Sequence, residues 1–256
     1  MNEVLEKDFL RRVDSLMNKT NVLYFSTGAD AVASYLKLKE HGIKPIMVYH
    51  YFIKDLPMVK NYIDYFEKKF DEHIYQFPST LWTERIDNAL YQPPIRARER
   101  FRNNIGHYEL DKFTKEAFDR LIADTLVEDV VFHLGLRYTD GMRRYQHLMK
   151  HGASYGNKFY PIASFQIRDV QNILEKNDCL LPLEYKLWGI SFESPRPWNI
   201  NLIKEHCSET YRQIQKIFPM VGAEGLRKYA ALNKHFKQRI TQFGKYAMPK
   251  EAYKVW

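Results

Sequence analysis

The sequence predicts an α/β protein in which a parallel sheet is flanked by helices, with a helical insertion and a helical C-terminal region. Three observations support this class. Short apolar runs of strand length alternate with amphipathic segments over the first 80 residues. Small or polar turn residues separate the two kinds of segment, as in βαβ units. From about Ser208 onward the spacing of apolar residues becomes helical.

The first elements follow in order from the N-terminus. Apolar residues at helical spacing predict a short amphipathic helix between Asn2 and about Lys19. Asn21–Phe25 is an apolar run of strand length, and the small polar turn Ser26–Asp30 follows it. Ala31–His41 has helical spacing and stops at a glycine, which is a common helix end. Together these segments form the first half of a βαβ unit.

The alternation continues along the chain. Pro45–Phe52 supplies a second strand, and a helix is expected from Leu56-Pro57 to Phe70. His73–Phe77 supplies a third strand. Strands that alternate with helices in this way predict parallel pairing through right-handed crossovers.

The rhythm of strands breaks between about residues 81 and 126, and a helical insertion near the mouth of the sheet is expected there. A strand signal returns at Asp129–Leu136, and a helix is expected near Ile167–Lys176. This pattern predicts one α/β domain over residues 1–200, followed by a basic helical extension over residues 201–256.

The composition limits the class of protein. The 256 residues include 39 lysines and arginines against 31 acidic residues, so the formal charge is +8 and an anionic partner is favoured. Two cysteines exclude a disulfide scaffold and a four-cysteine zinc or iron–sulfur site. The charged N-terminal stretch is unlike a signal peptide, and no apolar run is long enough for a membrane span. A cytoplasmic protein with no membrane partner is therefore expected.

The turn Ser26–Asp30 is the first candidate site, because ligands of parallel sheets bind at the carboxyl ends of the strands. Small residues let backbone N–H groups point outward, and the next helix directs its positive N-terminal dipole there. The alternative is an ordinary βα turn, which the spacing favours about equally. The turn is not a Walker A loop, since it lacks the G-x-x-x-x-G-K-[ST] pattern.

The second candidate site is Gly135–Arg144, which also follows a predicted strand. Arg137 and Arg144 beside a glycine-bearing turn could hold phosphate or sulfate oxygens through paired hydrogen bonds. The alternative is a solvated basic turn in which Asp140 neutralises one arginine.

Three blocks, in this order, resemble one family. Phe25–Ala31 stands where a superfamily has its S-G-G-K-D-S loop, and Gly135–Arg144 is similar to a G-x-R-x-x-[EQ]-S-x-x-R segment. Tyr160–Gly189 is similar to a stretch with the pattern P-I-x-x-W, D-V, P-L-Y and G. The chain thus resembles the phosphoadenosine phosphosulfate reductase family, within the PP-loop or adenine nucleotide α-hydrolase-like superfamily.

The resemblance implies a fold of that superfamily and an adenine nucleotide as the ligand. ATP or a phosphoadenosine phosphosulfate-like nucleotide is expected, with Mg²⁺ as an optional companion; neither a protein metal site nor an iron–sulfur cluster is expected. The resemblance also implies that the adenine base of the nucleotide lies near the end of the second predicted strand. The expected contact residues are Ser26, Thr27, Gly28, Ala29, Asp30, His50, Arg137, Asp140 and Arg144.

The sequence departs from the family in ways that bear on chemistry. Ala29 replaces the loop lysine and Ala31 the final serine, which puts cleavage of ATP between the α and β phosphates in doubt. The reductases use a nucleophilic cysteine near the C-terminus, whereas the cysteines here are Cys179 and Cys207. Thiol-based sulfate reduction is therefore not expected, and an enzyme would be of transferase or nucleotide α-hydrolase type.

Basic residues outside these blocks are candidates for nucleic-acid contact. The C-terminal segment mixes lysines and arginines with aromatic residues, which suits phosphate contact and base stacking. A solvated helix face with its aromatic residues packed inward is an equal alternative. The residues concerned are Arg96, Arg98, Arg100, Arg102, Arg227, Lys228, Lys234, Lys237 and Arg239.

Two functions remain open from the sequence. The first is an adenine-nucleotide-binding, non-reductase enzyme that performs nucleotidyl activation or group transfer on an anionic or nucleic-acid substrate. The second is an inactive module on the same fold that senses nucleotide or binds nucleic acid or a protein partner. Ala29 and Ala31 favour the second, and Asp30 with the arginines favours the first. A homodimer is compatible with both.

Overall fold

The structure is a computed structural model that describes residues 1–79, 81, 85, 91, 129–226 and 234–253. The longer helices are α1 (Glu3–Val13), α2 (Ala29–Glu40), α3 (Pro57–Phe70), α7 (Met142–His151), α8 (Ile167–Lys176), α11 (Ser208–Ile217) and α12 (Lys234–Phe243). The shorter ones are α9 (Glu184–Leu187), α10 (Ile200–His206) and the 3₁₀ turns η1 (Asp14–Leu16), η2 (Val221–Leu226), η3 (Gly244–Tyr246) and η4 (Lys250–Tyr253). The strands are β1 (Thr20–Tyr24), β2 (Ile46–Tyr51), β3 (Ile74–Pro78), β4 (Val130–His133), β5 (Ser154–Tyr155) and β6 (Lys158–Phe159).

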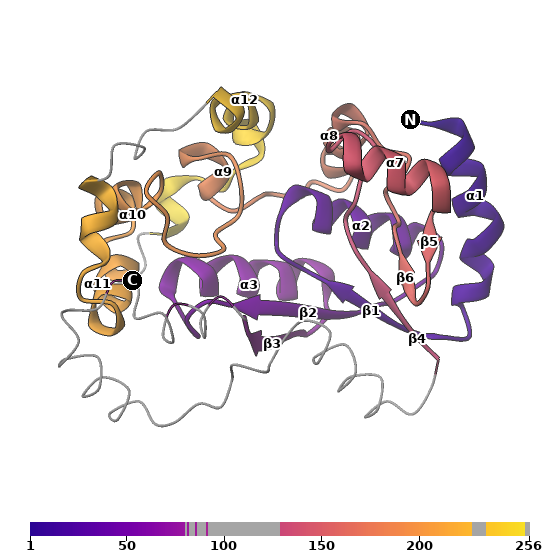
Figure 1. The fold of residues 1–256 in the computed structure, drawn as a ribbon. Coiled ribbons are helices and arrows are strands. Elements are labelled where there is room, and N and C mark those ends of the chain that lie inside the picture. The colour runs from indigo at the N-terminus through magenta and orange to yellow at the C-terminus, as the bar shows by residue number, and fades with distance from the viewer. Residues whose placement is uncertain (80, 82–84, 86–90, 92–128, 227–233, 254–256) are drawn as a thin grey trace. The chain divides into compact units, whose positions relative to one another are not determined.

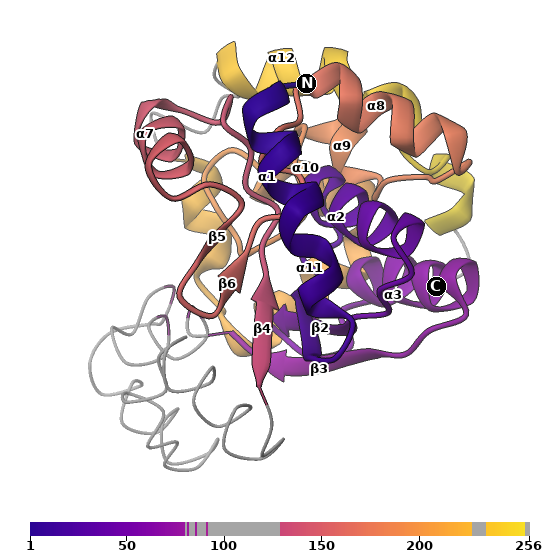
Figure 2. The same ribbon diagram turned by 90° about the vertical axis from the view of Figure 1, so that its right-hand side faces the viewer.

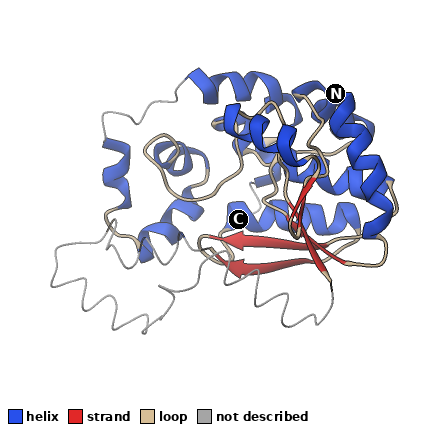
Figure 3. Ribbon diagram, turned by 45° about the vertical axis from the view of Figure 1, so that its right-hand side comes forward, coloured by secondary structure: helices blue, strands red, loops and turns tan. Residues whose placement is uncertain are grey.

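The strands form a six-stranded sheet in the order β3-β2-β1-β4-β6-β5. Figure 3 shows the strands in red and the helices in blue. β1 pairs in parallel with β2 on one side and with β4 on the other, and β4 pairs in parallel with β6. Helices flank this sheet, and the C-terminal region is helical (Figure 1). The α/β fold class predicted from the sequence is therefore confirmed.

The sheet differs from the prediction beyond β4. The fourth strand ends at His133 rather than at Leu136, and the Leu136 N–H turns back to the Leu134 carbonyl at 2.9 Å. The two-residue strands β5 and β6 form an antiparallel hairpin that makes the sheet mixed. Strands of two residues carry no periodic pattern, so the sequence could not indicate them. Helix α7 was also not expected, because it has a single buried residue, Leu148.

Clustering of close contacts divides the chain into two compact units. The first comprises residues 1–49, 66–76 and 122–182, and the second comprises residues 50–65, 77–121 and 183–256. The predicted division at residue 200 stays a prediction.

In the first unit, helix α1 is held by its N-cap and by contacts with α2. The Asn2 side chain caps it by accepting hydrogen bonds from the backbone of Val4 and Leu5. The buried Lys37 ammonium of α2 lies 2.6 Å from Glu6 of α1 and 3.9 Å from the centroid of the Phe9 ring. A core of α1, α2, β4 and β6 side chains lies beneath, formed by Phe9, Val13, Leu16, Leu38, Ile43, Val131, Ala153 and Phe159.

A histidine on β4 belongs to the core of the first unit. His133 is fully buried, and its Nε2 lies 2.8 Å from Oδ1 of Asn21 on the neighbouring strand β1. Burial lowers the pKa of His133 to about 3, so the ring stays neutral at physiological pH. His133 is thus a core histidine.

The second unit is held by aromatic packing and by helix contacts. The ring of Phe52 stacks on Phe218 at 5.4 Å, and Tyr91 meets the edge of the same ring at 6.0 Å. α10 packs on α11, and α12 packs on α9. Gly189 allows that second contact: an added Cβ would lie 2.7 Å from the Phe236 carbonyl oxygen, and its φ of +88° suits glycine.

Several predictions fall outside the described residues. The arginine-rich insertion, with Arg96, Arg98, Arg100 and Arg102, lies outside the described residues. Arg227 and Lys228 also lie outside them. Within the part of the chain that is described, none of the helices combines the length and apolar character needed to cross a membrane.

Candidate functional site

Two loops meet at the carboxyl ends of the central strands in the first unit. The chain leaves β1 at Tyr24 and enters α2 at Ala29, and it leaves β4 at His133 and enters α7 at Met142. β2 lies on one side of β1 and β4 on the other, so the direction of winding reverses between β1 and β4. In open α/β sheets ligands bind in the crevice at this switch point. The structure therefore brings the two predicted candidate segments to the same place.

Gly135 fits the second loop against the first. A Cβ at this position would lie 2.9 Å from both the carbonyl carbon and the carbonyl oxygen of Asp30. Real Cβ atoms essentially never come this close to backbone atoms, so only glycine is accommodated without a shift. The contact between Gly135 and Asp30 was not anticipated from the sequence, although a glycine inside a predicted strand is a signal for close backbone approach.

Replacing Gly135 with alanine is therefore expected to lower the free energy of unfolding by about 1–3 kcal/mol, as for overpacking of a tight contact. Urea denaturation measures this. The control is Gly244→Ala, where the added Cβ would meet its neighbours only at 3.6 Å or more and φ is not positive. The control is expected to be neutral or slightly stabilising. Equal stability of the two variants would contradict the tight contact.

The first loop contains a strained residue. Thr27 is fully buried with φ at +60°, and its hydroxyl donates a 2.6 Å hydrogen bond to the Ser26 carbonyl. A β-branched residue rarely adopts positive φ, and such strain costs about 1–3 kcal/mol. Gly28 and Ala29 are buried beside Thr27, whereas Ser26 is exposed. Strain of this kind concentrates at functional sites, so the turn stays a candidate site beside the alternative of an ordinary βα turn.

A chain of alternating charges connects the two loops. Arg137 Nε lies 2.8 Å from Asp30 Oδ1, and its Nη2 lies 2.7 Å from Asp140 Oδ1. Arg144 Nη1 then lies 2.9 Å from Asp140 Oδ2. The Nε–H of Arg137 is not aligned for a hydrogen bond to Asp30, so Coulomb attraction is the main force in that pair. Asp140 also accepts a hydrogen bond from the backbone N–H of Arg137.

The two arginines have different environments, and this separates their roles. The side chain of Arg137 is 3% exposed and is paired with two carboxylates, so its charge is already balanced inside the protein. The side chain of Arg144 is 52% exposed and contacts only one oxygen of Asp140 in the described ion pairs. Arg137 thus joins the two loops, whereas about half of the Arg144 side chain is accessible to solvent. The two arginines could not be distinguished from the sequence alone, because the burial of each side chain depends on the tertiary structure.

The remaining predicted contact residues are placed as follows. His50 lies in β2 and is assigned to the second unit, where its ring is 6.5 Å from that of Phe77. In α12, Lys234 and Lys237 are exposed. Arg239 is half-buried, donates to the Gly189 carbonyl at 3.2 Å and lies over the Phe243 ring. Arg239 therefore fixes α12, whereas the nucleic-acid role of the two lysines stays a prediction.

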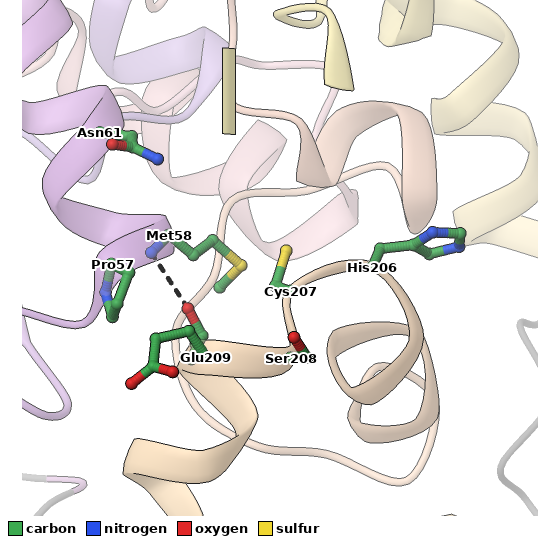
Figure 4. Close-up of a pocket in the computed structure, with 8 residues that line it drawn as sticks. Pro57, Met58, Asn61, His206, Cys207, Ser208 and Glu209 are labelled. Atoms are coloured by element: carbon green, nitrogen blue, oxygen red, sulfur yellow. Dashed lines mark hydrogen bonds between the residues drawn. The ribbon is translucent and has the colours of Figure 1, made fainter. Parts of the chain in front are cut away.

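A small pocket in the second unit lies between the first turn of α3 and the start of α11 (Figure 4). Met58 N–H donates to the Thr210 hydroxyl across it, at 3.1 Å, and Cys207, His206 and Glu209 are among its lining residues. Its volume of about 80 Å³ is well below the roughly 300–1,000 Å³ of typical ligand pockets. It is therefore too small for a nucleotide.

Both thiols are poor nucleophiles. Burial raises the pKa of Cys179 to about 11 and that of Cys207 to about 12. Reactive cysteines depend on the thiolate, which these two residues do not form at neutral pH. Among the described residues, no three His, Cys, Asp or Glu side chains lie close enough to hold a metal ion.

Glu184 in the second unit is a buried carboxyl. Its side chain is fully buried, and desolvation raises its pKa to about 8. The backbone N–H groups of Glu184 and Phe192 oppose this rise, but neither forms a well-aligned hydrogen bond to its oxygens. Glu184 is therefore mostly protonated at neutral pH.

No protein-family model matches the sequence, and no curated protein is similar enough to it to count as a relative. The structure supports a mixed, mostly parallel α/β sheet, and the fold stands without an assigned family.

Proposed function

We propose that this protein binds an adenine nucleotide at the junction of the β1–α2 and β4–α7 loops, in the manner of the PP-loop superfamily that its motifs resemble. The observation that carries the proposal is the meeting of these loops at the switch point of the sheet, where Gly135 approaches Asp30. The order of the motif blocks along the chain supports the same assignment.

The nucleotide's phosphates are assigned to the N-terminus of α2. This helix is 12 residues long, begins beside the strained Thr27, and has no side-chain cap. Helix N-termini stabilise anions through their dipole and their N–H groups. Arg144 supplies an exposed positive charge, and the Arg137 ion pairs keep the loops in position.

The chemistry we favour is nucleotidyl activation or group transfer rather than reduction of sulfate. The high pKa values of the two thiols argue against a cysteine nucleophile. A catalytically inactive binding module is the second candidate. It is favoured by Ala29 in place of a loop lysine and by the neutralisation of Arg137 by Asp30 and Asp140.

Isothermal calorimetry with ATP, AMP and phosphoadenosine phosphosulfate tests the proposal, and micromolar binding of at least one is expected. Arg144→Ala should weaken it about 5- to 30-fold, equivalent to about 1–2 kcal/mol for a partly exposed charged hydrogen bond. The control is Arg212→Ala, because Arg212 is 65% exposed and likewise paired with a nearby carboxylate on a helix. Absence of heat with all three nucleotides would reject the proposal.

Release of pyrophosphate distinguishes the two candidates. An activating enzyme is expected to release it from ATP when its substrate, such as a nucleic acid, is present. A binding module is expected to bind the nucleotide without turnover.

A further inference from the structure

Helix α7 and the β5–β6 hairpin present an unusual surface of the first unit. We call it the α7 face and define it by Met142, Arg143, Tyr145, Met149 and Lys150 of α7 and by Tyr155 of β5. Each of these side chains is exposed, Met142 by 71% and Tyr155 by 54%. Figure 2 shows α7 and the hairpin with α1 close to them. Arg12 of α1 donates to the Ser154 hydroxyl at 3.0 Å, and its charge is balanced by Asp8 at 2.9 Å, so this part of α1 adds no net charge to the face.

The α7 face is positively charged. The sequence of α7, MRRYQHLMKH, contains three arginines or lysines and two histidines but no acidic residue. Arg143 and Lys150 are seven residues apart, which places them two turns apart along one stripe of the helix. The face therefore fits a polyanion and disfavours a second copy of itself, because like charges would meet.

Aromatic and thioether side chains flank the charges. Met142, Tyr145 and Met149 follow the i, i+3, i+7 spacing of one helix stripe. On the other side, the ring of His151 lies 4.3 Å from that of Tyr155. Exposed rings beside phosphate-binding cations are the arrangement that single-stranded nucleic acids use, since their unpaired bases stack on flat side chains. A membrane-binding helix face typically carries more large aliphatic side chains than the α7 face does.

The α7 face adjoins the candidate nucleotide site. α7 begins two residues after Asp140, and its first turn contains Arg144, which pairs with that carboxylate. A strand lying along α7 would thus approach the loop junction where the nucleotide is placed.

We propose that the α7 face binds single-stranded nucleic acid, through phosphate contacts of Arg143 and Lys150 and base stacking on Tyr145 and Tyr155. This deepens the proposed function and rests on it for the biological role, because the bound strand becomes the substrate class of the nucleotide site. The binding itself requires no nucleotide.

Fluorescence anisotropy with a labelled 12-nucleotide RNA, the same DNA strand and its duplex tests the proposal on the full chain. Binding of a single strand in preference to the duplex is expected. Arg143→Ala/Lys150→Ala should weaken it at least tenfold and lower the slope of log K against log salt by about 1.4, for two lost phosphate contacts. Tyr145→Ala/Tyr155→Ala should weaken it about tenfold with little change in slope.

Matched variants elsewhere on the first unit are the controls. Lys44→Ala/Lys68→Ala removes the same charge from exposed lysines, and Tyr75→Ala removes a tyrosine that is 48% exposed. Both should bind like the wild type. The proposal would be overturned if the α7 variants bound single strands as tightly as the wild type, or if the protein preferred the duplex. Displacement of the labelled strand by poly-glutamate as readily as by unlabelled strand would also overturn it.

Calorimetry of the same proteins with nucleotide separates the two proposals. The α7 double variants are expected to keep nucleotide binding, since neither changes Arg144. Loss of single-strand binding with nucleotide binding intact supports the α7 face. If calorimetry shows no nucleotide binding while anisotropy shows selective binding of single strands, the proposed function is rejected and the proposal for the α7 face is supported.

Discussion

Replacing Arg137 with methionine is expected to lower the free energy of unfolding by about 3–5 kcal/mol, because it removes the buried guanidinium that pairs with both Asp30 and Asp140. The Arg137 side chain is 3% exposed and that of Asp140 is 8% exposed, so solvent screens these pairs weakly. Urea denaturation followed by circular dichroism measures the loss.

The control for this prediction is Arg144→Met, which removes an arginine that is 52% exposed from the same carboxylate. A loss of at most about 1 kcal/mol is expected for it, as for surface ion pairs. The triple variant Asp30→Asn/Arg137→Met/Asp140→Asn should regain part of the stability, because the two carboxylate charges that Arg137 balanced are then removed with it. Equal losses for Arg137→Met and Arg144→Met would contradict the distinct roles assigned to the two arginines.

This expectation changes how the candidate site is tested. Loss of nucleotide binding in an Arg137 variant would not distinguish a direct contact from collapse of the loops that Arg137 joins. Arg144 is the informative position, because its exposed side chain can be removed without unpairing the interior.

Replacing Glu184 with glutamine is expected to remove a large pH dependence of stability. The pKa of Glu184 is about 8 in the folded protein and about 4.5 in the unfolded chain. The folded state therefore holds the proton more tightly, and this stabilisation is complete below about pH 4.5 and lost as the pH rises through 8. The loss amounts to about 5 kcal/mol above pH 8, of which about 3 kcal/mol is already gone at pH 7.

The difference between the unfolding profiles of Glu184→Gln and wild type from pH 4 to 9 isolates this carboxyl from all others. As the pH rises from 4 to 9, the free energy of unfolding of the variant is expected to increase by about 3–5 kcal/mol relative to that of the wild type. Glu193→Gln, at a carboxylate that is 67% exposed, is the control and should follow the wild-type profile. A Glu184→Gln profile parallel to the wild type would show that this carboxyl does not hold a proton in the folded state.

Much of the fold follows from local patterns. The strand at Asn21–Phe25 and the helix near Ile167–Lys176 were expected from apolar spacing, and the structure has them as β1 and α8. Neither α7 nor the β5–β6 hairpin could be predicted, because one has a single buried residue and the other has strands of only two residues. Periodicity detects burial on one face of an element, so elements with little burial escape it.

The candidate site divides in the same way. Motif order pointed to the turn Ser26–Asp30 and to the segment Gly135–Arg144. The contact of Gly135 with Asp30, the strain at Thr27 and the buried position of Arg137 depend on which strands are neighbours. Pairing of β1 with β4 joins residues more than 100 positions apart, which no local pattern reports.

The sequence by itself determined the α/β class, most of the strands and helices, and the two segments that carry the candidate chemistry. These are properties of short stretches, governed by local spacing and turn residues. Only the tertiary structure decided that the two segments meet. It also decided that Arg137 is buried and paired while Arg144 is half-exposed, and that α7 presents charged and aromatic side chains to solvent. Burial and pairing arise from long-range packing, and they determine which of several similar side chains can meet a ligand.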